Sequence, residues 1–485
     1  MNIKPSALLP LLPLLFAAAP LAPSAVRPGT PFGDHAVLQS GMKVPVWGNA
    51  DPGESVTVSF SGQRKETQAD TRGRWRVELD PMPAGKSGDL RIGDKAFSDV
   101  VTGEVWFVGG QSNAALSLKR AVTDADAEIA QANHPQIRVW TSKVIVSKTP
   151  RSLGGGSWSV CTPENAGNFT GMGYIFAREL SAARGNVPVG IISCNRGGAP
   201  IFSMISPAAF EKNPFAAEVE AHFAPLAARS PKNAFMSKGA LWNGMIRPLT
   251  AHAAYAMRGV LWNQGEADVR VCHAYESLFA SLVQCWRAQW KRDDLPFYVV
   301  QLANISDKGS HEPAGSDKWP LMREAQEGAR RIPNVWVSVG IDIGCLDETP
   351  NTARHPANKR ELGRRLALLA RAHTYGESDL PGGLADSPFF QKAVVKAGRV
   401  VCHFDASAKG LKTRDGGAPG GFEIAGADGK FTPAVAVIEG ETIALASPSV
   451  KAPRAARYAW NNTCEGANVI NAAGLPLAPF RTVSR

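Results

Sequence analysis

The sequence predicts an α/β protein, in which a parallel sheet lies between two layers of helices and a smaller β unit flanks it on either side. Three observations support this prediction. Between residues 101 and 376, short apolar runs alternate with segments of helical periodicity, a pattern typical of a parallel sheet covered on both faces. Residues 26–100 alternate between apolar and polar side chains at the period of β-strands. The same alternation returns in residues 377–485.

The first 25 residues are predicted to be a secretory signal peptide. Lys4 precedes an apolar run from Ala7 to Phe16, and small residues follow this run up to Ala25. A charged start, a short apolar core and a small-residue exit are the features of a cleavable signal. No later stretch approaches the ~18 apolar residues that a transmembrane helix needs. We therefore expect a secreted or periplasmic protein, without a membrane anchor once the signal is cleaved.

The two flanking units are predicted to resemble β-sandwiches. Turn-forming residues separate their alternating runs, as in the segment Asp51-Pro52-Gly53-Glu54 and in the glycine-rich stretch 416–421. Strands are expected at residues 44–48, 55–60, 400–404, 434–438 and 457–460. The N-terminal unit carries no obvious catalytic motif.

The central region is predicted to contain buried strands and amphipathic helices in alternation. Its strands are short apolar runs that stop at polar or glycine-rich turns, at residues 105–110, 187–193, 257–262, 297–302 and 335–341. Its helices show a 3.6-residue apolar period, at residues 171–183, 275–290 and 359–373. Gly185 and Gly376 follow two of these helices as stop signals.

Composition excludes several classes of protein. The 485 residues are 44% hydrophobic and 20% charged, which is ordinary for a globular chain and argues against disorder. The net charge of +10 comes from scattered Lys and Arg residues without a nucleic-acid-binding motif, so we expect no nucleic-acid partner. The seven cysteines include no CxxC pair and no zinc-type spacing, and we expect no metal or organic cofactor.

Four strands of the central region end in polar or glycine-rich turns. These turns are Gly110-Gln111-Ser112-Asn113, Gly197-Gly198, Asn263-Gln264-Gly265-Glu266 and the segment that contains Asp342. The carboxyl ends of parallel strands meet at one edge of a sheet, where ligands bind in open α/β folds. The sequence therefore predicts an active site at this edge.

The predicted site contains a candidate nucleophile and a candidate base. Ser112 stands in the first turn, and His355 lies between the last sheet strand and a helix, where it could reach the same edge. The oxyanion of an acyl-transfer reaction needs hydrogen-bond donors. Backbone N–H groups of Ser112 and of Gly197 or Gly198, with a side-chain amide of Gln264 or Asn263, could supply them.

Other chemistries fit the sequence less well. The serine lacks the second glycine of the G-x-S-x-G elbow that ordinary α/β-hydrolases share. The glycines at 154–156 are not followed by a GK[ST] sequence, and the chain contains neither an H-E-x-x-H motif nor a dinucleotide fingerprint.

Several ordered blocks of sequence resemble one family of esterases. They are Gly103-Glu104-Val105-Trp106 leading to Gly110-Gln111-Ser112-Asn113, Leu241-Trp242-Asn243-Gly244, Gly259-Val260-Leu261-Trp262-Asn263-Gln264-Gly265-Glu266, Arg323-Glu324-Ala325-Gln326, and His355-Pro356 with Lys359. In this order they resemble the sialate O-acetylesterase family, a branch of the SGNH hydrolases. The resemblance covers nearly all of the chain after its predicted signal.

The resemblance implies a flavodoxin-like three-layer SGNH domain and a serine esterase that removes O-acetyl groups from sugars, with sialic acids as the namesake substrates. It implies Ser112 as the nucleophile, His355 as the base, and Gly197 or Gly198 with Gln264 as the oxyanion hole. The neighbouring polar residues of the turns are expected to bind the acetylated sugar; they are Gln111, Asn113, Asn263 and Glu266.

The sequence departs from the family pattern at two places. Ala114 stands where the family has methionine, and no aspartate lies two or three residues before His355. Asp347 and Asp342 are the nearest aspartates that could orient the histidine, and a Ser-His dyad is the other possibility. Two alternative functions remain open: an esterase for acetylxylan or another polysaccharide, and a glycan-binding protein without catalysis.

Overall fold

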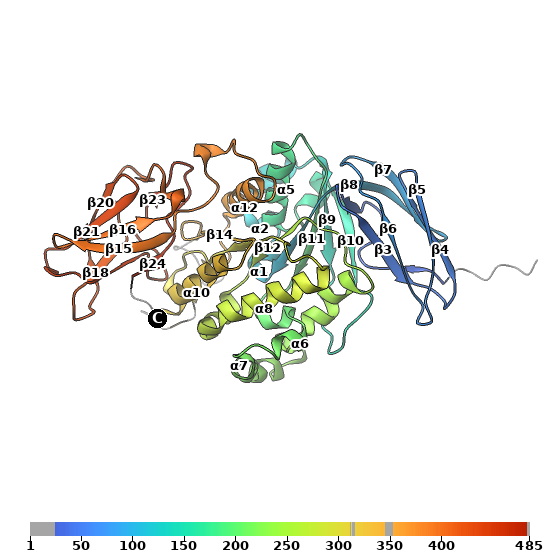
Figure 1. The fold of residues 1–485 in the computed structure, drawn as a ribbon, viewed down its shortest axis with the longest axis horizontal. Coiled ribbons are helices and arrows are strands. Elements are labelled where there is room, and N and C mark those ends of the chain that lie inside the picture. Colours follow the sequence, from blue (N-terminus) through green and yellow to red (C-terminus); the bar gives the residue numbers. More distant parts are fainter. Residues whose placement is uncertain (1–24, 311, 313–315, 345–352, 483–485) are drawn as a thin grey trace, which may run out of the picture.

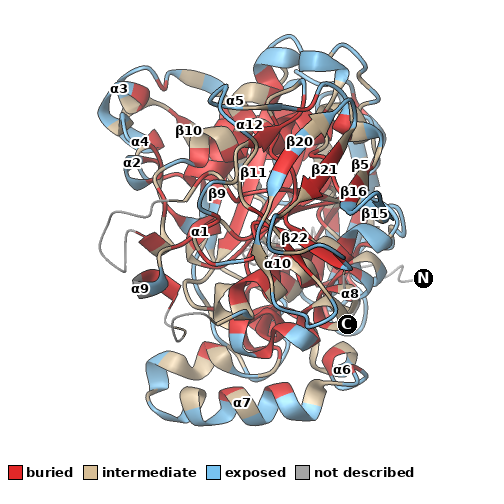
Figure 2. Cartoon of the chain, turned by 90° about the vertical axis from the view of Figure 1, so that its left-hand side faces the viewer, coloured by how far each residue is buried: buried red, intermediate tan, exposed pale blue. Residues whose placement is uncertain are grey.

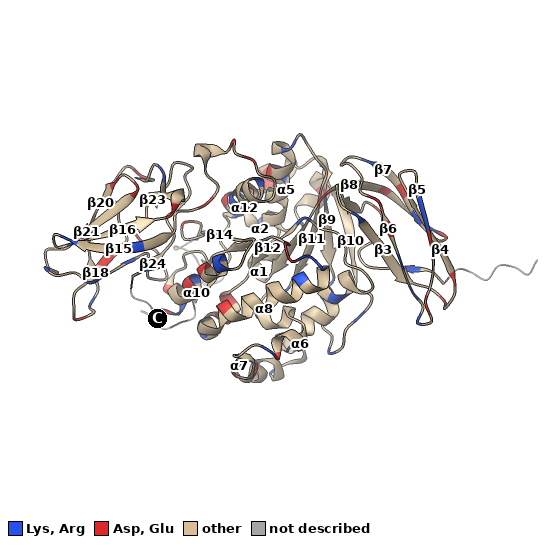
Figure 3. Cartoon of the chain, viewed as in Figure 1, with Lys and Arg blue, Asp and Glu red and all other residues tan. Residues whose placement is uncertain are grey.

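The computed structural model describes residues 25–310, 312, 316–344 and 353–482. It shows a mixed α/β region in the middle of the molecule with a β unit at each end, as Figure 1 shows. The two extra β units that the sequence predicted are therefore confirmed. The predicted signal peptide lies, except for Ala25, outside the described residues. Lys and Arg residues are scattered over all three parts, as Figure 3 shows.

The N-terminal β unit contains two sheets. One is antiparallel and consists of β1 (Arg27–Pro28), β3 (Val44–Asn49) and β6 (Arg74–Leu79). The other contains β2 (Val37–Gln39), β4 (Ser55–Phe60), β5 (Gln63–Gln68), β7 (Ser87–Ile92) and the first part of β8 (Lys95–Gly110). In β6, Trp75, Val77 and Leu79 are buried while the residues between them are exposed, which confirms the predicted alternation.

One long strand, β8, joins the N-terminal unit to the central sheet. Its first residues pair with β7 and β2, whereas its last residues pair with β11 (Val189–Asn195) and β12 (Gly259–Asn263). The boundary predicted between residues 100 and 101 falls within this strand. The end of β8 is therefore held by neighbours on both sides, which fixes the position of the turn that follows it.

The central sheet is mixed. Its parallel strands are β9 (His134–Ser142), β11, β8, β12, β13 (Phe297–Val300) and β14 (Val335–Ser338), in that spatial order. The prediction of a wholly parallel sheet is wrong at one edge, where β10 (Gly156–Cys161) pairs antiparallel with β9. An antiparallel strand can return from its neighbour without a helical crossover, and the glycines at 154–156, which stand at the start of β10, do not by themselves give the direction of the strand that follows.

The strand order places a binding crevice between β8 and β12. Five of the parallel strands lie in the order β11-β8-β12-β13-β14, which is the order 2-1-3-4-5 along the chain. In sheets with this order, ligands bind beyond the carboxyl ends of the strands, where the direction of the connections reverses. That point lies here between the turn after β8 and the turn after β12.

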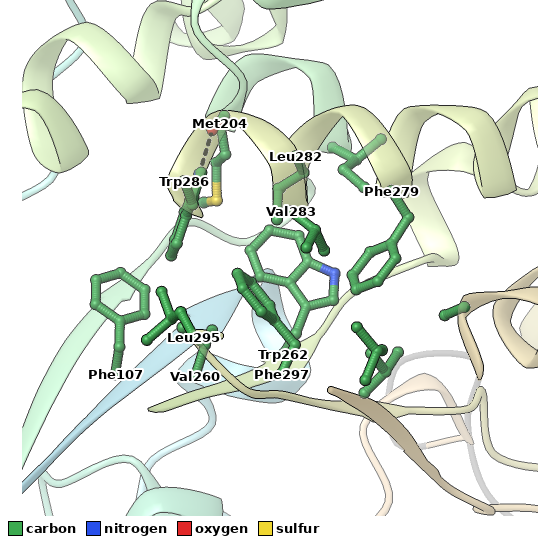
Figure 4. Packing of buried hydrophobic residues seen from close by; sticks show 14 of the residues in the cluster. Phe107, Met204, Val260, Trp262, Phe279, Leu282, Val283, Trp286, Leu295 and Phe297 are labelled. Atoms are coloured by element: carbon green, nitrogen blue, oxygen red, sulfur yellow. Dashed lines mark hydrogen bonds between the residues drawn. The ribbon is translucent and has the colours of Figure 1, made fainter. Parts of the chain in front are cut away.

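Helices cover both faces of the sheet. α5 (Gly171–Ala183) and α12 (Lys359–His373) pack on the face of Trp106 and Val108. α8 (Cys272–Trp290) and α10 (Lys318–Glu327) lie on the opposite face (Figures 1 and 4). The predicted helices are confirmed, and α8 begins three residues before its predicted start. Figure 2 shows that the central strands are almost wholly buried.

Further helices fill the connections between the central strands. They are α1 (Ser112–Ala115), α2 (Leu118–Ala121), α3 (Ala125–Ala130), α4 (Pro163–Ala166), α6 (Pro207–Phe210), α7 (Ala216–Ala228), α9 (Asp307–Ser310), and the 3-10 or π turns η1 (Ile201–Met204), η2 (Pro231–Met236), η3 (Trp242–Ile246), η4 (Arg247–Thr250), η5 (Glu266–Val271) and η6 (Gly328–Arg331).

The C-terminal β unit consists of antiparallel strands and packs against the central region. The strands are β15 (Phe390–Lys396), β16 (Arg399–Phe404), β17 (Lys412–Thr413), β18 (Phe422–Ala425), β19 (Thr432–Pro433), β20 (Val435–Glu439), β21 (Thr442–Ala446), β22 (Ala455–Tyr458), β23 (Val469–Ile470) and β24 (Phe480–Arg481), with η7 (Pro381–Gly383) and η8 (Ala406–Ala408) between them. The buried Arg323 joins the two parts, because its guanidinium donates to carbonyls of Leu302 and Ala303 and of Asn461 and Asn462.

Candidate active site

A glycine turn places Ser112 at the crevice. β8 ends at Gly110, whose φ is 137° and whose added Cβ would lie 2.0 Å from the carbonyl oxygen of Asn263. A residue with a side chain would be strained and would clash at this position. The chain therefore turns sharply after the strand, and Ser112 becomes the first residue of α1. The sequence predicted this turn and its place at the sheet edge.

Gly197, in the turn after β11, lies beside the serine. A Cβ on Gly197 would be 3.6 Å from the Cβ of Ser112, which is ordinary contact distance. The turn itself is held by a hydrogen bond from the Arg196 N–H to the Gly110 carbonyl, 3.3 Å long. The two predicted glycine turns are thus brought together, and the glycine leaves open space next to the serine.

Ser112 and His355 line the same cavity of about 470 Å³. Gly197, Gly198, Gln111 and Glu266 border it as well. Its remaining walls come from segments far apart in the chain, namely Phe223, Leu226, Met236, Ala267, Ser310, Trp319 and Arg354. The sequence did not single out these wall residues, because neither periodicity nor a motif marks a residue that faces a cavity from α7, η2 or α10.

Gln264 is part of the scaffold beneath the cavity. Its side chain is 1% exposed, and its amide nitrogen lies 3.2 Å from Gln111 Oε1, 3.1 Å from the Ala199 carbonyl oxygen, and within hydrogen-bond distance of Asp268. Tyr275 Oη lies 3.0 Å from its Oε1. The two N–H groups of this amide therefore have acceptors inside the protein.

Asn263 also faces the interior. Its side chain is 3% exposed, and its amide nitrogen lies 3.7 Å from the sulfur of Met172, away from the cavity-lining residues. Its backbone carbonyl accepts a hydrogen bond from the Gln111 N–H at 3.1 Å. Asn263 thus holds the turn after β8 through its backbone.

A buried hydrogen-bond chain joins the serine turn to the histidine loop. Asn113 Nδ2 donates to the carboxylate of Glu266 and, at 2.9 Å, to the carbonyl of Arg354. Lys359 Nζ, also buried, donates to the Pro356 carbonyl at 3.0 Å. Burial lowers the pKa of Lys359 to about 8, while the nearby Glu266 carboxylate acts in the opposite direction. These contacts fix the backbone on both sides of His355.

Of the two aspartates that could orient His355, the structure describes Asp342. Both carboxylate oxygens of Asp342 accept hydrogen bonds from Arg365, at 2.7 and 2.8 Å, and Arg414 binds Oδ2 at 2.6 Å. Burial alone would raise the pKa of Asp342, but the two guanidinium groups hold it below its ordinary value. Asp347 lies outside the described residues.

Asp268 is a buried acid that sequence reasoning missed. Its side chain is fully buried, and its Oδ2 accepts hydrogen bonds from Gln264 and, at 3.1 Å, from the Ile201 N–H. It thereby connects the turn after β12 to the turn after β11. Burial raises the pKa of Asp268 to about 7, against the opposing effect of these donors. The signal that could have found it is its position two residues after Glu266.

We expect Asp268→Asn to flatten the dependence of the free energy of unfolding on pH. An acid whose pKa is raised on folding, here from 3.8 to about 7, binds more protons in the folded state between these values. Stability therefore falls as pH rises through this window, by at most about 1.4 kcal/mol per pH unit, and is constant above it. Denaturant unfolding at several pH values would measure the slope.

The control for this prediction is Asp94→Asn, which changes an exposed aspartate. That variant should keep the slope of the wild-type protein. Identical slopes for the Asp268→Asn and wild-type proteins would contradict the assignment of a raised pKa to Asp268.

Within the described part of the chain, His, Cys, Asp and Glu side chains form no group of three that could hold a metal ion. No helix there combines the length and the apolar character that crossing a bilayer requires.

The comparison with known proteins decides the family. A family model described as "Carbohydrate esterase, sialic acid-specific acetylesterase" matches residues 102–371, which is more than half of the chain. The chain belongs to this family. It is therefore a carboxylic ester hydrolase, and the resemblance predicted from its motifs is confirmed.

Individual members of this carbohydrate esterase family agree. The sialate O-acetylesterase of Homo sapiens is 27% identical over 375 residues, which cover 69% of this chain and 68% of that protein. The enzyme of Mus musculus is 28% identical over 391 residues, covering 69% and 71%. The crystal structure of a carbohydrate acetylesterase from Xanthomonas citri is 36% identical, covers 95% of this chain and 100% of its own, and has a TM-score of 0.84.

Proposed function

We propose that the protein is a serine esterase of the SGNH type that removes O-acetyl groups from carbohydrates. The observation that carries this proposal is the cavity that Ser112 and His355 share, which Gly197 borders beside the serine. The strand order β11-β8-β12-β13-β14, which is flavodoxin-like, supports the SGNH assignment. Membership in a family of carbohydrate acetylesterases supports the choice of ester.

In the proposed mechanism, Ser112 Oγ attacks the acetyl carbonyl carbon while the His355 ring takes the hydroxyl proton. Backbone N–H groups of Ser112 and of Gly197 or Gly198 stabilise the tetrahedral oxyanion. The C–O bond to the sugar then breaks, and His355 returns the proton to the sugar oxygen. Water attacks the acetyl-enzyme by the same route and releases acetate.

The remaining polar residues are assigned supporting roles. Gln111 and Glu266 border the cavity and are proposed to contact the sugar. Asn113, Asn263 and Gln264 hold the turns through the hydrogen bonds described above. For the acid that orients His355, we favour Asp347 over Asp342, because both carboxylate oxygens of Asp342 already bind arginine side chains.

Sialic acids are the proposed substrate class, because the matching family is described as sialic acid-specific. Acetylated xylan or another polysaccharide is the second candidate, since the relative from Xanthomonas citri is described more broadly as a carbohydrate acetylesterase. Release of acetate from a panel of O-acetylated sialic acids and acetylated polysaccharides would separate the two. The predicted signal peptide supports a place outside the cytoplasm, where such glycans occur.

The mechanism predicts that an organophosphate labels Ser112 covalently. Activation by His355 makes this hydroxyl far more nucleophilic than an ordinary serine hydroxyl. Mass spectrometry of the intact protein and of its peptides should find one adduct, at Ser112, and none in the His355→Ala variant. Labelling elsewhere, or none in a folded protein, would favour the alternative of a glycan-binding protein without catalysis.

A further inference from the structure

Arg354 is a cavity-lining arginine whose charged group has no counter-ion in the described structure. It borders the cavity of Ser112 and His355. No carboxylate of the described residues forms an ion pair with it, and its buried Nε has no hydrogen-bond partner there. Its backbone carbonyl, by contrast, is fixed by Asn113 at 2.9 Å.

The other buried arginines near the site are satisfied. Arg323 donates to four backbone carbonyls. Arg365 binds Asp342 and Glu361 through charge-assisted hydrogen bonds of 2.7 to 2.8 Å. A partly buried guanidinium without such partners is costly, and it stays charged because arginine is not deprotonated in proteins. Among the described residues, Arg354 thus lacks the partners that these two arginines have, and we take this as a sign of a partner that arrives with the ligand.

The charged groups that interact beside this part of the cavity are Glu266, Lys359 and the buried Asp268, whose pKa burial raises to about 7. Glu266 is the carboxylate that borders the same cavity, and one of its oxygens is bound by Asn113. The buried Lys359 lies close enough to Glu266 for the two charges to interact, and it donates to the Pro356 carbonyl. Two cationic side chains, Arg354 and Lys359, thus stand near Glu266, whose Oε1 is bound by Asn113 and whose buried Oε2 has no hydrogen-bond partner among the described residues.

We propose that Arg354 binds a carboxylate group in the active-site cavity and thereby determines specificity. The planar guanidinium can bind a carboxylate through two parallel hydrogen bonds. Two carboxylates share this chemistry: that of an acidic sugar such as a sialic or uronic acid, and that of the acetate released by the reaction. The inference rests on the proposed esterase function, since both carboxylates reach the cavity as substrate or product.

The first arm of the test compares an O-acetylated sialic acid with its carboxamide analogue, which lacks the negative charge. The wild-type enzyme should prefer the acid by about 10- to 100-fold in kcat/KM, mostly through KM, because a charge-assisted hydrogen bond is lost with the amide. Arg354→Gln should bring the ratio close to one, and Arg354→Lys should keep part of it. Because the ratio compares kcat/KM for two substrates of the same variant, a general loss of activity does not change it.

The second arm measures inhibition by free acetate with an aryl acetate as substrate. If acetate is the carboxylate that Arg354 binds, its inhibition constant should rise about tenfold in Arg354→Gln. Arg270→Gln is the matched control, because it removes an exposed arginine from η5, outside the cavity, and should leave both the ratio and the inhibition constant unchanged. An unchanged ratio together with an unchanged inhibition constant in Arg354→Gln would overturn the proposal.

A binding measurement separates this inference from the proposed function. Calorimetric titration of Ser112→Ala with N-acetylneuraminic acid and with acetate needs no turnover. Weaker binding of either ligand in the Ser112→Ala/Arg354→Gln protein would support Arg354 even if the catalytic assignment failed. Equal binding of both ligands would overturn it even if Ser112 proved to be the nucleophile.

Discussion

Ser112→Ala is expected to lower kcat for an aryl acetate by roughly four to six orders of magnitude, since losing the nucleophile of a serine hydrolase removes the whole covalent route. The oxyanion donors and the cavity remain, so a small residual rate over water should persist. Stability should change by less than about 0.5 kcal/mol. The reason is that Ser112 is only partly buried and borders the cavity, so its replacement by alanine removes one oxygen atom without opening a void in the core.

The matched control is Ser310→Ala. Ser310 borders the same cavity, but its hydroxyl donates to the Asp307 carbonyl at 2.9 Å and accepts from the Glu312 N–H at 3.2 Å. Its replacement should cost less than about tenfold in kcat, because it alters local hydrogen bonds and leaves the nucleophile in place. Acetate release, measured in quenched aliquots of the reaction, gives kcat for both variants. A Ser112→Ala enzyme with wild-type turnover would exclude the mechanism.

The turn after β8 and the bounds of the helices could be predicted because they depend on residues that are adjacent in sequence. An apolar run that stops at Gly110 can only turn, and the positive φ observed there explains why the sequence has glycine. Helices such as α12 were found at their observed bounds, since amphipathic periodicity and a stop signal coincide. His355 was predicted from its place between the last sheet strand and a helix, and the resemblance implied the same residue.

What could not be predicted depends on contacts between distant segments. Gln264 and Asn263 are adjacent amides, and their neighbours in space decide that both face the interior. β10 pairs antiparallel with β9, and no residue of β10 predicts the direction of this pairing. Arg354 stands beside His355 in sequence, yet only the folded contacts show that its buried Nε has no hydrogen-bond partner among the described residues.

Asp342→Ala should lower the free energy of unfolding by about 3–5 kcal/mol. This is the cost of removing one partner of a buried ion pair. The side chains of Asp342 and Arg365 are 7% and 4% exposed. The substitution leaves the Arg365 guanidinium with Glu361 as its remaining carboxylate, and it also releases Arg414 of the C-terminal unit. Denaturant unfolding at neutral pH measures the loss.

Two comparisons distinguish this structural role from a catalytic one. Asp342→Ala/Arg365→Leu should be more stable than Asp342→Ala alone, because it also removes a buried guanidinium that would otherwise keep only Glu361 as a carboxylate partner. If Asp342 oriented His355 instead, Asp342→Asn would lower kcat by about 10⁴, as the loss of a triad aspartate does. We expect that loss for Asp347→Asn. A large kcat loss in Asp342→Asn with normal stability would assign the acid to Asp342, and the arginines around it would then tune the catalytic carboxylate.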